Sequence, residues 1–140
     1  MFAVVERGGN VRAATIANIT RDNLRKHMLD LVDERNARLI TDESNLYQKI
    51  GREFAGGHET VNHSKKEYVR FGSDVHTNTI EGFFSLIKRG VYGTFHSVSK
   101  AHLHRYLAEF EFRYNTRKMN DGERVVEAIR GGEGKRLKYT

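Results

Sequence analysis

Two β-rich stretches near the start of the chain are separated by a turn that contains two glycines. The stretches are residues 2–6 (FAVVE) and 11–19 (VRAATIANI), and the turn between them is Arg7-Gly8-Gly9-Asn10. Gly and Asn adopt the positive φ angles that tight hairpin turns need. The pattern therefore predicts an antiparallel hairpin, and the rest of the chain must pack around it.

A helix, a strand and a second helix are predicted after the hairpin. Thr20 is placed to cap the first helix, whose apolar side chains recur at helical spacing. Residues 37–42 (ARLITD) predict a short apolar strand. A second helix is predicted to begin at Glu43 or Ser44 and to end at Gly56-Gly57. The apolar positions expected to face the core are Leu24, Met28, Leu31 and Val32 in the first helix, and Leu46, Ile50 and Phe54 in the second.

The remainder of the chain is predicted to be mainly helical. Residues 58–63 give a weaker strand pattern, and residues 64–75 form a polar, basic run that is typical of a loop. Helices are predicted at 78–89, 98–117 and 122–130, and the second of these carries one apolar stripe made by Leu103, Leu107, Phe110 and Tyr114. A hairpin followed by alternating helices and strands indicates an α/β layered fold.

Composition limits the class of protein. A chain of 140 residues, 38% hydrophobic and 30% charged, suffices for one soluble domain with a single core. No apolar run approaches the roughly 20 residues that span a bilayer, so no membrane partner is expected. The lack of cysteine excludes disulfides and thiolate zinc sites, and without a secretory signal a cytoplasmic protein is expected. A net charge of +6 favours a polyanionic partner, nucleic acid above all.

Asp42 ends the apolar strand predicted at 37–42. Catalytic and ligand-binding groups of open α/β sheets gather at such strand ends, because a side chain there emerges from rigid backbone into a crevice. A plainer interpretation is that Thr41-Asp42-Glu43-Ser44 is a strand-to-helix turn in which the acid caps the turn. The residues alone leave both interpretations open.

Glu81 and Lys88 also have two interpretations. They lie seven residues apart in the helix predicted at 78–89, so they share one helix face. Asn78-Thr-Ile-Glu81 has the spacing of a capping box, and a solvated Glu/Lys face is ordinary on a helix. The alternative is that Glu81 binds a metal ion while Lys88 beside it receives a phosphate.

A basic and aromatic segment, residues 88–96 (KRGVYGTFH), follows that helix and is expected to be a loop in which Gly90 and Gly93 break the helix. Lys and Arg neutralise phosphates, and aromatic rings stack on unpaired bases, so the segment suits contact with DNA. A solvated basic surface is the alternative. The predicted DNA-binding residues are Lys88, Arg89, Tyr92, His96, Arg105 and Arg113.

Residues 76–118 (HTNTIEGFFSLIKRGVYGTFHSVSKAHLHRYLAEFEFRYNTRK) resemble the C-terminal part of a bacterial insertion-sequence transposase. The TNTIEG, YGTFH, SKAHLHRY and EFRYN pieces occur in the family's order and spacing. The family is the DDE class with an RNase H-like catalytic domain, in the branch whose glutamate is followed seven residues later by a lysine. RLITDES and VVERGGNVRA upstream are also similar to the family.

The resemblance implies a role for each matching residue. Asp42 corresponds to the family's second catalytic aspartate, Glu81 to its glutamate, and Lys88 to a lysine that contacts DNA near the scissile phosphate. His76 and Asn78 lie in the same motif and are assigned supporting roles. Such carboxylates hold two Mg²⁺ or Mn²⁺ ions for DNA cleavage and strand transfer. The implied partners are the element's terminal inverted repeats and target DNA.

The resemblance also implies that one part is missing. The family's first aspartate lies on a central strand that precedes the hairpin, and the acids of the first helix are poor substitutes for it. We therefore expect residues 1–118 to form a partial RNase H-like mixed sheet flanked by helices, lacking its first, central strand, with a short helix and basic tail at 119–140. The isolated chain is expected to be truncated and inactive, and to self-associate or to pair with a missing N-terminal portion. The alternatives are a non-catalytic DNA-binding remnant and another RNase H-like nuclease or resolvase.

Overall fold

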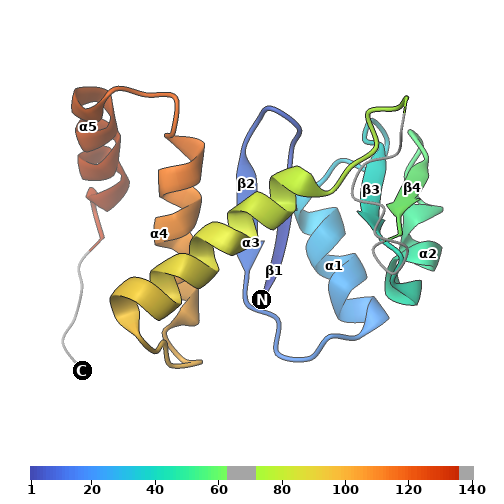
Figure 1. The fold of residues 1–140 in the computed structure, drawn as a ribbon, viewed down its shortest axis with the longest axis horizontal. Coiled ribbons are helices and arrows are strands. Elements are labelled where there is room, and N and C mark those ends of the chain that lie inside the picture. The colour runs from blue at the N-terminus through green and yellow to red at the C-terminus, as the bar shows by residue number, and fades with distance from the viewer. Residues whose placement is uncertain (63–71, 136–140) are drawn as a thin grey trace.

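The computed structural model describes residues 1–62 and 72–135, which form an α/β structure as the sequence predicts (Figure 1). The strands are β1 (Phe2–Val5), β2 (Val11–Ala14), β3 (Leu39–Asp42) and β4 (His58–Val61). The helices are α1 (Arg21–Leu31), α2 (Asn45–Gly51), α3 (Asn78–Gly90), α4 (Leu103–Asn115) and α5 (Asp121–Gly132), with a π-helical turn η2 (Val91–Phe95) after α3. Most of the loop predicted at 64–75 lies outside the described residues.

The predicted hairpin is confirmed. β1 pairs with β2 in antiparallel register, with Phe2 opposite Ala14 and Val5 opposite Val11. Gly8 in the turn has a φ of 73°, a value that favours glycine. The second strand ends at Ala14, earlier than the predicted residue 19, because the chain turns there toward α1.

Side chains from α4 cover the outer edge of β2. The side-chain amide of Asn115 forms two hydrogen bonds with the backbone of Val11. Val11 N donates to Asn115 Oδ1 at 2.7 Å, and Asn115 Nδ2 donates to Val11 O at 3.0 Å. Two residues along the strand, Ala13 N donates to Glu111 Oε2 at 2.9 Å. The helix thus supplies the hydrogen bonds that a further strand would otherwise supply.

β3 and β4 form a second, parallel pair, in which Leu39 lies opposite His58 and Asp42 opposite Val61. Within the described residues this pair and the hairpin are two separate two-stranded sheets, and no ladder joins β1 to β3. The weaker strand prediction at 58–63 is therefore confirmed. The sequence predicts a mixed sheet that lacks its first, central strand, and the described residues contain these two separate strand pairs.

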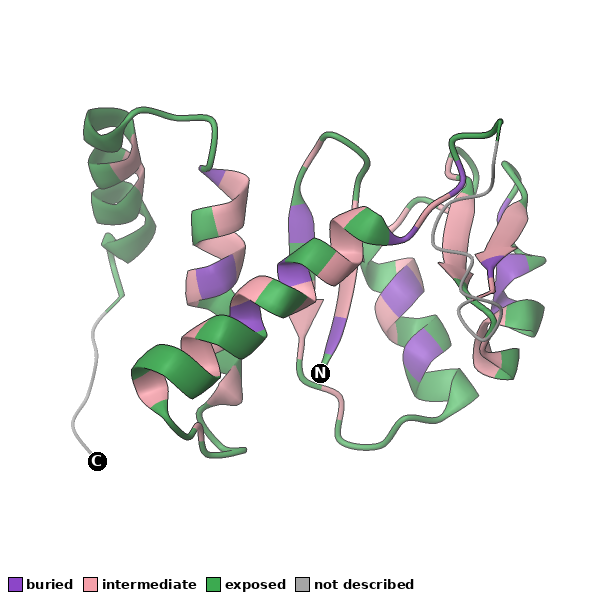
Figure 2. Cartoon of the chain, in the orientation of Figure 1, coloured by how far each residue is buried: buried purple, intermediate pink, exposed green. Residues whose placement is uncertain are grey.

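Two apolar clusters hold the elements together, as the buried stripes in Figure 2 show. One joins α1 and α2 to the strands: Phe2, Leu24, Met28, Ile50 and Phe54 are buried, and Val4 and Leu39 pack against them. The other lies between the hairpin and the helices α3 and α4, where Val11, Phe83, Ile87, Leu107 and Phe110 are buried. The hairpin therefore contributes to both clusters.

Local capping fixes where α1 and α2 begin. Thr20 caps α1 by accepting a hydrogen bond from Asn23 N at 3.3 Å, and Ser44 caps α2 by accepting from Leu46 N at 3.5 Å. Thr20 is the predicted cap, and α2 begins directly after Ser44, close to the predicted start. The helix ends at Gly51 rather than at the predicted Gly56-Gly57. Leu31, predicted to face the core, is instead 39% exposed at the last turn of α1.

The predicted loop at 88–96 is helical instead. α3 continues to Gly90 and passes directly into η2, and His96 then ends the turn with a φ of 58°. Gly90 does not break the helix; it lets α4 approach closely, since a Cβ there would lie 2.2 Å from Phe110 Cζ. Gly90 therefore serves the packing of α3 against α4 rather than a turn.

Candidate functional site

Asp42 lies at the end of β3 and is exposed, as the strand-end prediction requires. Its Oδ1 accepts a hydrogen bond from Ser44 N at 3.1 Å, so the acid also caps the turn into α2. Asp42 Oδ2 accepts no hydrogen bond from the described residues. The turn therefore orients the carboxylate and leaves one of its oxygens available to a ligand.

Tyr47, one turn into α2, is a neighbour of Asp42 that the sequence did not single out. Burial raises the pKa of the Tyr47 phenol, and the negative charge of Asp42 raises it further. The position of Tyr47 three residues after Ser44 was the available signal, because the first turn of α2 faces the end of β3.

Glu81 lies in the first turn of α3 and is half-buried. Its Oε1 accepts a hydrogen bond from the Thr77 hydroxyl at 2.6 Å, and Thr77 is itself buried. The capping box considered for Asn78 is not formed: Thr77 is the N-cap residue, Asn78 is the first residue of the helix, and neither Thr77 nor Asn78 makes the side-chain cap. Thr77 was missed by sequence reasoning, and it fixes the orientation of the glutamate.

His76 precedes this pair. Its Nδ1 is buried and has no hydrogen-bond partner among the residues that the structure describes. A buried ring nitrogen without a partner is uncommon in proteins. Asn78 is exposed at the helix start. The supporting roles of His76 and Asn78 stay a prediction.

Asp74 connects the approach to α3 with both strand pairs. Arg7 Nη1, after β1, lies 3.3 Å from Asp74 Oδ2, and Arg38, before β3, donates to the same carboxylate oxygen. The hydrogen bond from Arg38 lowers the pKa of Asp74, and the charges of Arg38 and Arg7 lower it further. The segment leading to Glu81 is therefore tied to the start of β3, whereas Asp42 ends that strand.

The two predicted metal ligands are consequently held by separate local contacts. Among residues 1–62 and 72–135 there is no group of three or more His, Asp or Glu side chains placed to hold a metal ion. Asp42 and Glu81 do not form part of a complete ligand set in this part of the chain.

Five of the six predicted DNA-binding residues lie between the end of α3 and the first turn of α4, where the chain passes through η2 (Figure 1). We call this surface the α3–α4 corner; it comprises Lys88, Arg89, Tyr92, His96 and Arg105, all of them exposed. Lys88 lies on the same helix as Glu81, about 10 Å further along the axis. Arg113 stands apart near the other end of α4, where it pairs with Glu109 at 2.7 Å.

These features define an α/β protein with acids at a strand end and a helix start and with a basic, aromatic corner. A family profile described as the ISXO2-like transposase domain matches residues 1–115, and the chain belongs to this family. Comparison with curated proteins and comparison with solved structures gave no match. Membership in a transposase family implies interaction with DNA. None of the helices in the described residues is both long and apolar enough to cross a membrane.

Proposed function

We propose that the chain carries two of the three metal-binding carboxylates of a DDE-type DNA transposase, Asp42 and Glu81. Membership in the transposase family carries this proposal, because the match over residues 1–115 includes both acids and Lys88. The reaction is metal-dependent DNA cleavage followed by strand transfer at the ends of an insertion sequence.

The donor atoms at these positions suit Mg²⁺ or Mn²⁺. Both ions prefer carboxylate oxygens, and Asp42 offers an oxygen that makes no hydrogen bond to the described residues. Glu81 is oriented by the hydroxyl of Thr77. When bound, such ions activate water or a DNA 3′-hydroxyl and stabilise the leaving oxygen.

Lys88 and the other residues of the α3–α4 corner position the DNA. Lys88 and Arg89 end α3 exposed, so they can neutralise backbone phosphates two helical turns from Glu81. Tyr92, at 75% exposure, can stack on an unpaired base. The contacts to phosphate hold the strand in register, while the carboxylates act on one phosphodiester.

Two open strand edges support the proposal that the third carboxylate comes from a strand outside the 140 residues. Glu6 N donates to Asn10 O, so the alternation of the ladder directs the backbone groups of Ala3 and Val5 away from β2. No hydrogen bond from the described residues reaches those groups. In β3, Leu39 N donates to Gly57 O, so Ile40 is directed away from β4 in the same way.

The two open edges have compatible directions. Arg7 follows β1 and Arg38 precedes β3, and both bind Asp74, so β1 and β3 run in opposite directions. Phe2 and Leu39 also pack into one apolar cluster, which α1 covers. A strand between them would run antiparallel to β1 and parallel to β3, giving one mixed sheet of the RNase H-like kind. Its last residues would lie at the end of β3 that carries Asp42.

The test is DNA cleavage by the chain with and without an added strand. An apolar strand containing one aspartate is joined ahead of Met1 through a short Gly/Ser turn, and the substrate is a duplex with the element's terminal repeats. We expect the chain alone to bind this DNA without cutting it. The extended chain should cut it with Mg²⁺, and an asparagine in place of the added aspartate should abolish cutting.

Substitutions within the chain assign the ligands. In the extended chain, Asp42→Asn and Glu81→Gln should each abolish cleavage and retain DNA binding. Glu43→Gln and Glu109→Gln remove one acid each at positions that are not proposed ligands, and they should retain cleavage. Cleavage that survives Glu81→Gln would overturn the assignment. DNA binding without cleavage in every version would support a non-catalytic DNA-binding protein instead.

A further inference from the structure

Helix α5 (Asp121–Gly132) lies beyond the residues matched by the transposase family and has its own start signal. Asn120 Oδ1 accepts from Glu123 N at 3.0 Å, and Glu123 Oε2 accepts from Asn120 N at 3.2 Å, which completes a capping box. The helix is thus defined by its own sequence rather than by packing, and no residue within it is buried.

The side of α5 that contacts its own chain is polar. Arg124 Nη2 donates to the carbonyl oxygens of Thr116 and Met119 at 3.4 Å each, and Arg124 Nη1 lies 3.3 Å from Asp121 Oδ1. These contacts hold the first turns of α5 to the end of α4. They occupy the face on which an amphipathic helix would ordinarily place its apolar side chains.

The apolar side chains of α5 are directed to solvent instead. Val125, Val126 and Ile129 are exposed to 57%, 47% and 68%. They span about 100° around the helix and form one stripe on the side away from Arg124. Contiguous exposed apolar patches mark interaction sites. We refer to these three residues as the α5 stripe.

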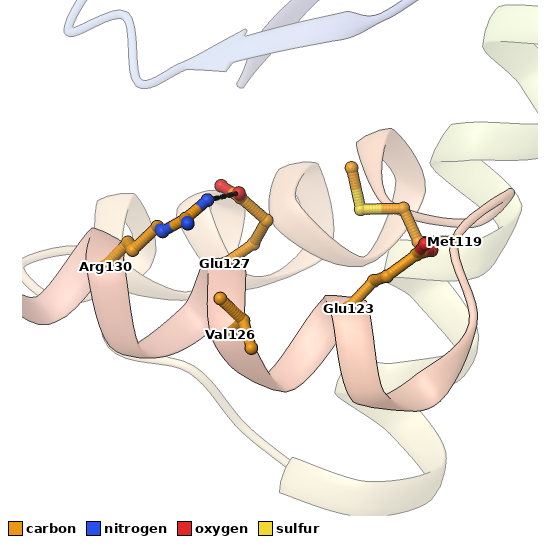
Figure 3. A pocket seen from close by; sticks show the side chains of 5 residues that line it. All are labelled: Met119, Glu123, Val126, Glu127 and Arg130. Atoms are coloured by element: carbon orange, nitrogen blue, oxygen red, sulfur yellow. Dashed lines mark hydrogen bonds and ion pairs between the residues drawn. The ribbon is translucent and has the colours of Figure 1, made fainter.

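Beside the stripe lies a shallow open hollow, shown in Figure 3. Its lining is mostly charged, and Arg130 Nη1 is paired with Glu127 Oε1 at 2.9 Å across it. The hollow is formed by α5 and the residue Met119 alone. A small apolar ligand would be poorly enclosed there, so the surface fits a macromolecular partner better than a small molecule.

We propose that the α5 stripe docks on the same stripe of a second copy of this chain, with the two helices antiparallel. Charge complementarity selects this occupant. Glu123 and Arg130 lie seven residues apart, so they share one flank of the stripe. In an antiparallel pair each flank meets the same flank of the other helix, which brings Glu123 of one copy to Arg130 of the other in both directions.

A parallel arrangement lacks this match. It would set the flank of Glu123 and Arg130 against the opposite flank, which carries Asp121 and Ala128, and acid would meet acid at the helix start. The antiparallel pair is also isologous, as twofold-symmetric dimers require. One helix pair buries less than the roughly 1,200–2,000 Å² of a stable interface, so the dimer is weak and its formation depends on concentration.

Analytical ultracentrifugation of the full chain between about 10 µM and 1 mM tests the surface. The wild-type chain should dimerise over this range, and Ile129→Asp should weaken the dimer at least about tenfold, because it places a charge in the apolar stripe. Ile19→Asp is the matched control, since Ile19 is exposed to 63% outside α5, and it should dimerise like the wild type. A monomeric wild type, an unaffected Ile129→Asp or an equal loss in Ile19→Asp would overturn the proposal.

Charge reversal tests the antiparallel pairing. Glu123→Arg alone and Arg130→Glu alone should each fail to self-associate, whereas an equimolar mixture of the two should form a heterodimer through the restored pairs. Circular dichroism of each variant checks that α5 still forms, since Glu123 also belongs to the capping box. A mixture that stays monomeric while both variants keep their helix would contradict the antiparallel arrangement.

Discussion

The two outer edges of the hairpin differ in whether their backbone groups are hydrogen-bonded. On β2, the backbone of Val11 and Ala13 is hydrogen-bonded by the side chains of Asn115 and Glu111 from α4. On β1, the corresponding groups of Ala3 and Val5 receive no hydrogen bond from the described residues. Because an unpaired strand edge invites another strand, the covered edge ends the sheet, whereas the open edge is where the sheet can continue. The difference supports an incomplete sheet rather than an intrinsically two-stranded one.

Proline substitutions at Ala3 and Ala13 should reveal the difference between the two edges most clearly. Ala3 and Ala13 are cross-strand partners, and each N–H points to its own outer edge. Ala13→Pro removes the donor to Glu111, whose side chain is only 18% exposed. Ala3→Pro removes a donor that has no partner in residues 1–62 and 72–135. Ala13→Pro should lower the free energy of unfolding by about 2–3 kcal/mol more than Ala3→Pro, as expected for a hydrogen bond to a charged group.

Urea unfolding monitored by circular dichroism measures both variants under the same conditions. Equal losses for Ala3→Pro and Ala13→Pro would show that the two edges do not differ. A larger loss of stability for Ala3→Pro would show that the β1 edge contributes more to stability than the β2 edge.

Gly90 and Gly82 allow a second comparison within α3, the helix that covers the hairpin. A Cβ at Gly90 would meet the ring of Phe110 at 2.2 Å, whereas nothing lies within 4 Å of a Cβ at Gly82. Gly90→Ala should therefore lower the free energy of unfolding by about 1–2 kcal/mol through overpacking. Gly82→Ala should raise it by about 0.4–1 kcal/mol, because alanine restricts the unfolded chain.

Thermal unfolding of Gly90→Ala and Gly82→Ala shows directly whether each substitution lowers or raises stability. The same sign for both would remove the argument that Gly90 is required for the close approach of α4.

The second strand pair differs from the hairpin in having a titratable contact across it. His58 Nε2 lies 2.9 Å from Thr41 Oγ1, and burial lowers the pKa of His58 below its ordinary value of 6.5. The unfolded chain therefore binds a proton more readily, so the stabilisation is complete above pH 6.5 and declines as the pH falls below it. The change in stability caused by His58 should be smaller than the changes expected for the proline and glycine substitutions, because much of the His58 ring is solvated.

Thermal melts between pH 7.5 and pH 5.5 would measure it. His58→Gln should flatten the decline in melting temperature over that window. A slope that is unchanged in His58→Gln would assign the effect to other groups.

Local signals in the sequence predicted the elements well. Thr20 and Ser44 cap the helices that were expected, and the glycine turn places the hairpin correctly, because each depends on neighbouring residues only. Gly90 was misinterpreted, since its use depends on Phe110 of another helix. The same limit applies to the candidate site.

The candidate site was predictable in position but not in arrangement. The strand-end location of Asp42 and the first-turn location of Glu81 follow from their own segments. The ion pairs of Asp74 with Arg7 and Arg38 were not predictable, because packing brings these residues together. The hydrogen bond from Thr77 to Glu81 is local, but the capping-box spacing of Asn78 indicated a different cap residue.

Metal binding by the strand-extended chain tests whether Asp42 and Glu81 are metal ligands. Calorimetric titration with Mn²⁺ reports ligation at Asp42 and Glu81 independently of DNA binding and of turnover. The extended chain should bind Mn²⁺, and Asp42→Asn and Glu81→Gln should each weaken Mn²⁺ binding, whereas Glu43→Gln should not. Unchanged Mn²⁺ binding in Asp42→Asn and Glu81→Gln would contradict the claim that these two acids are the metal ligands.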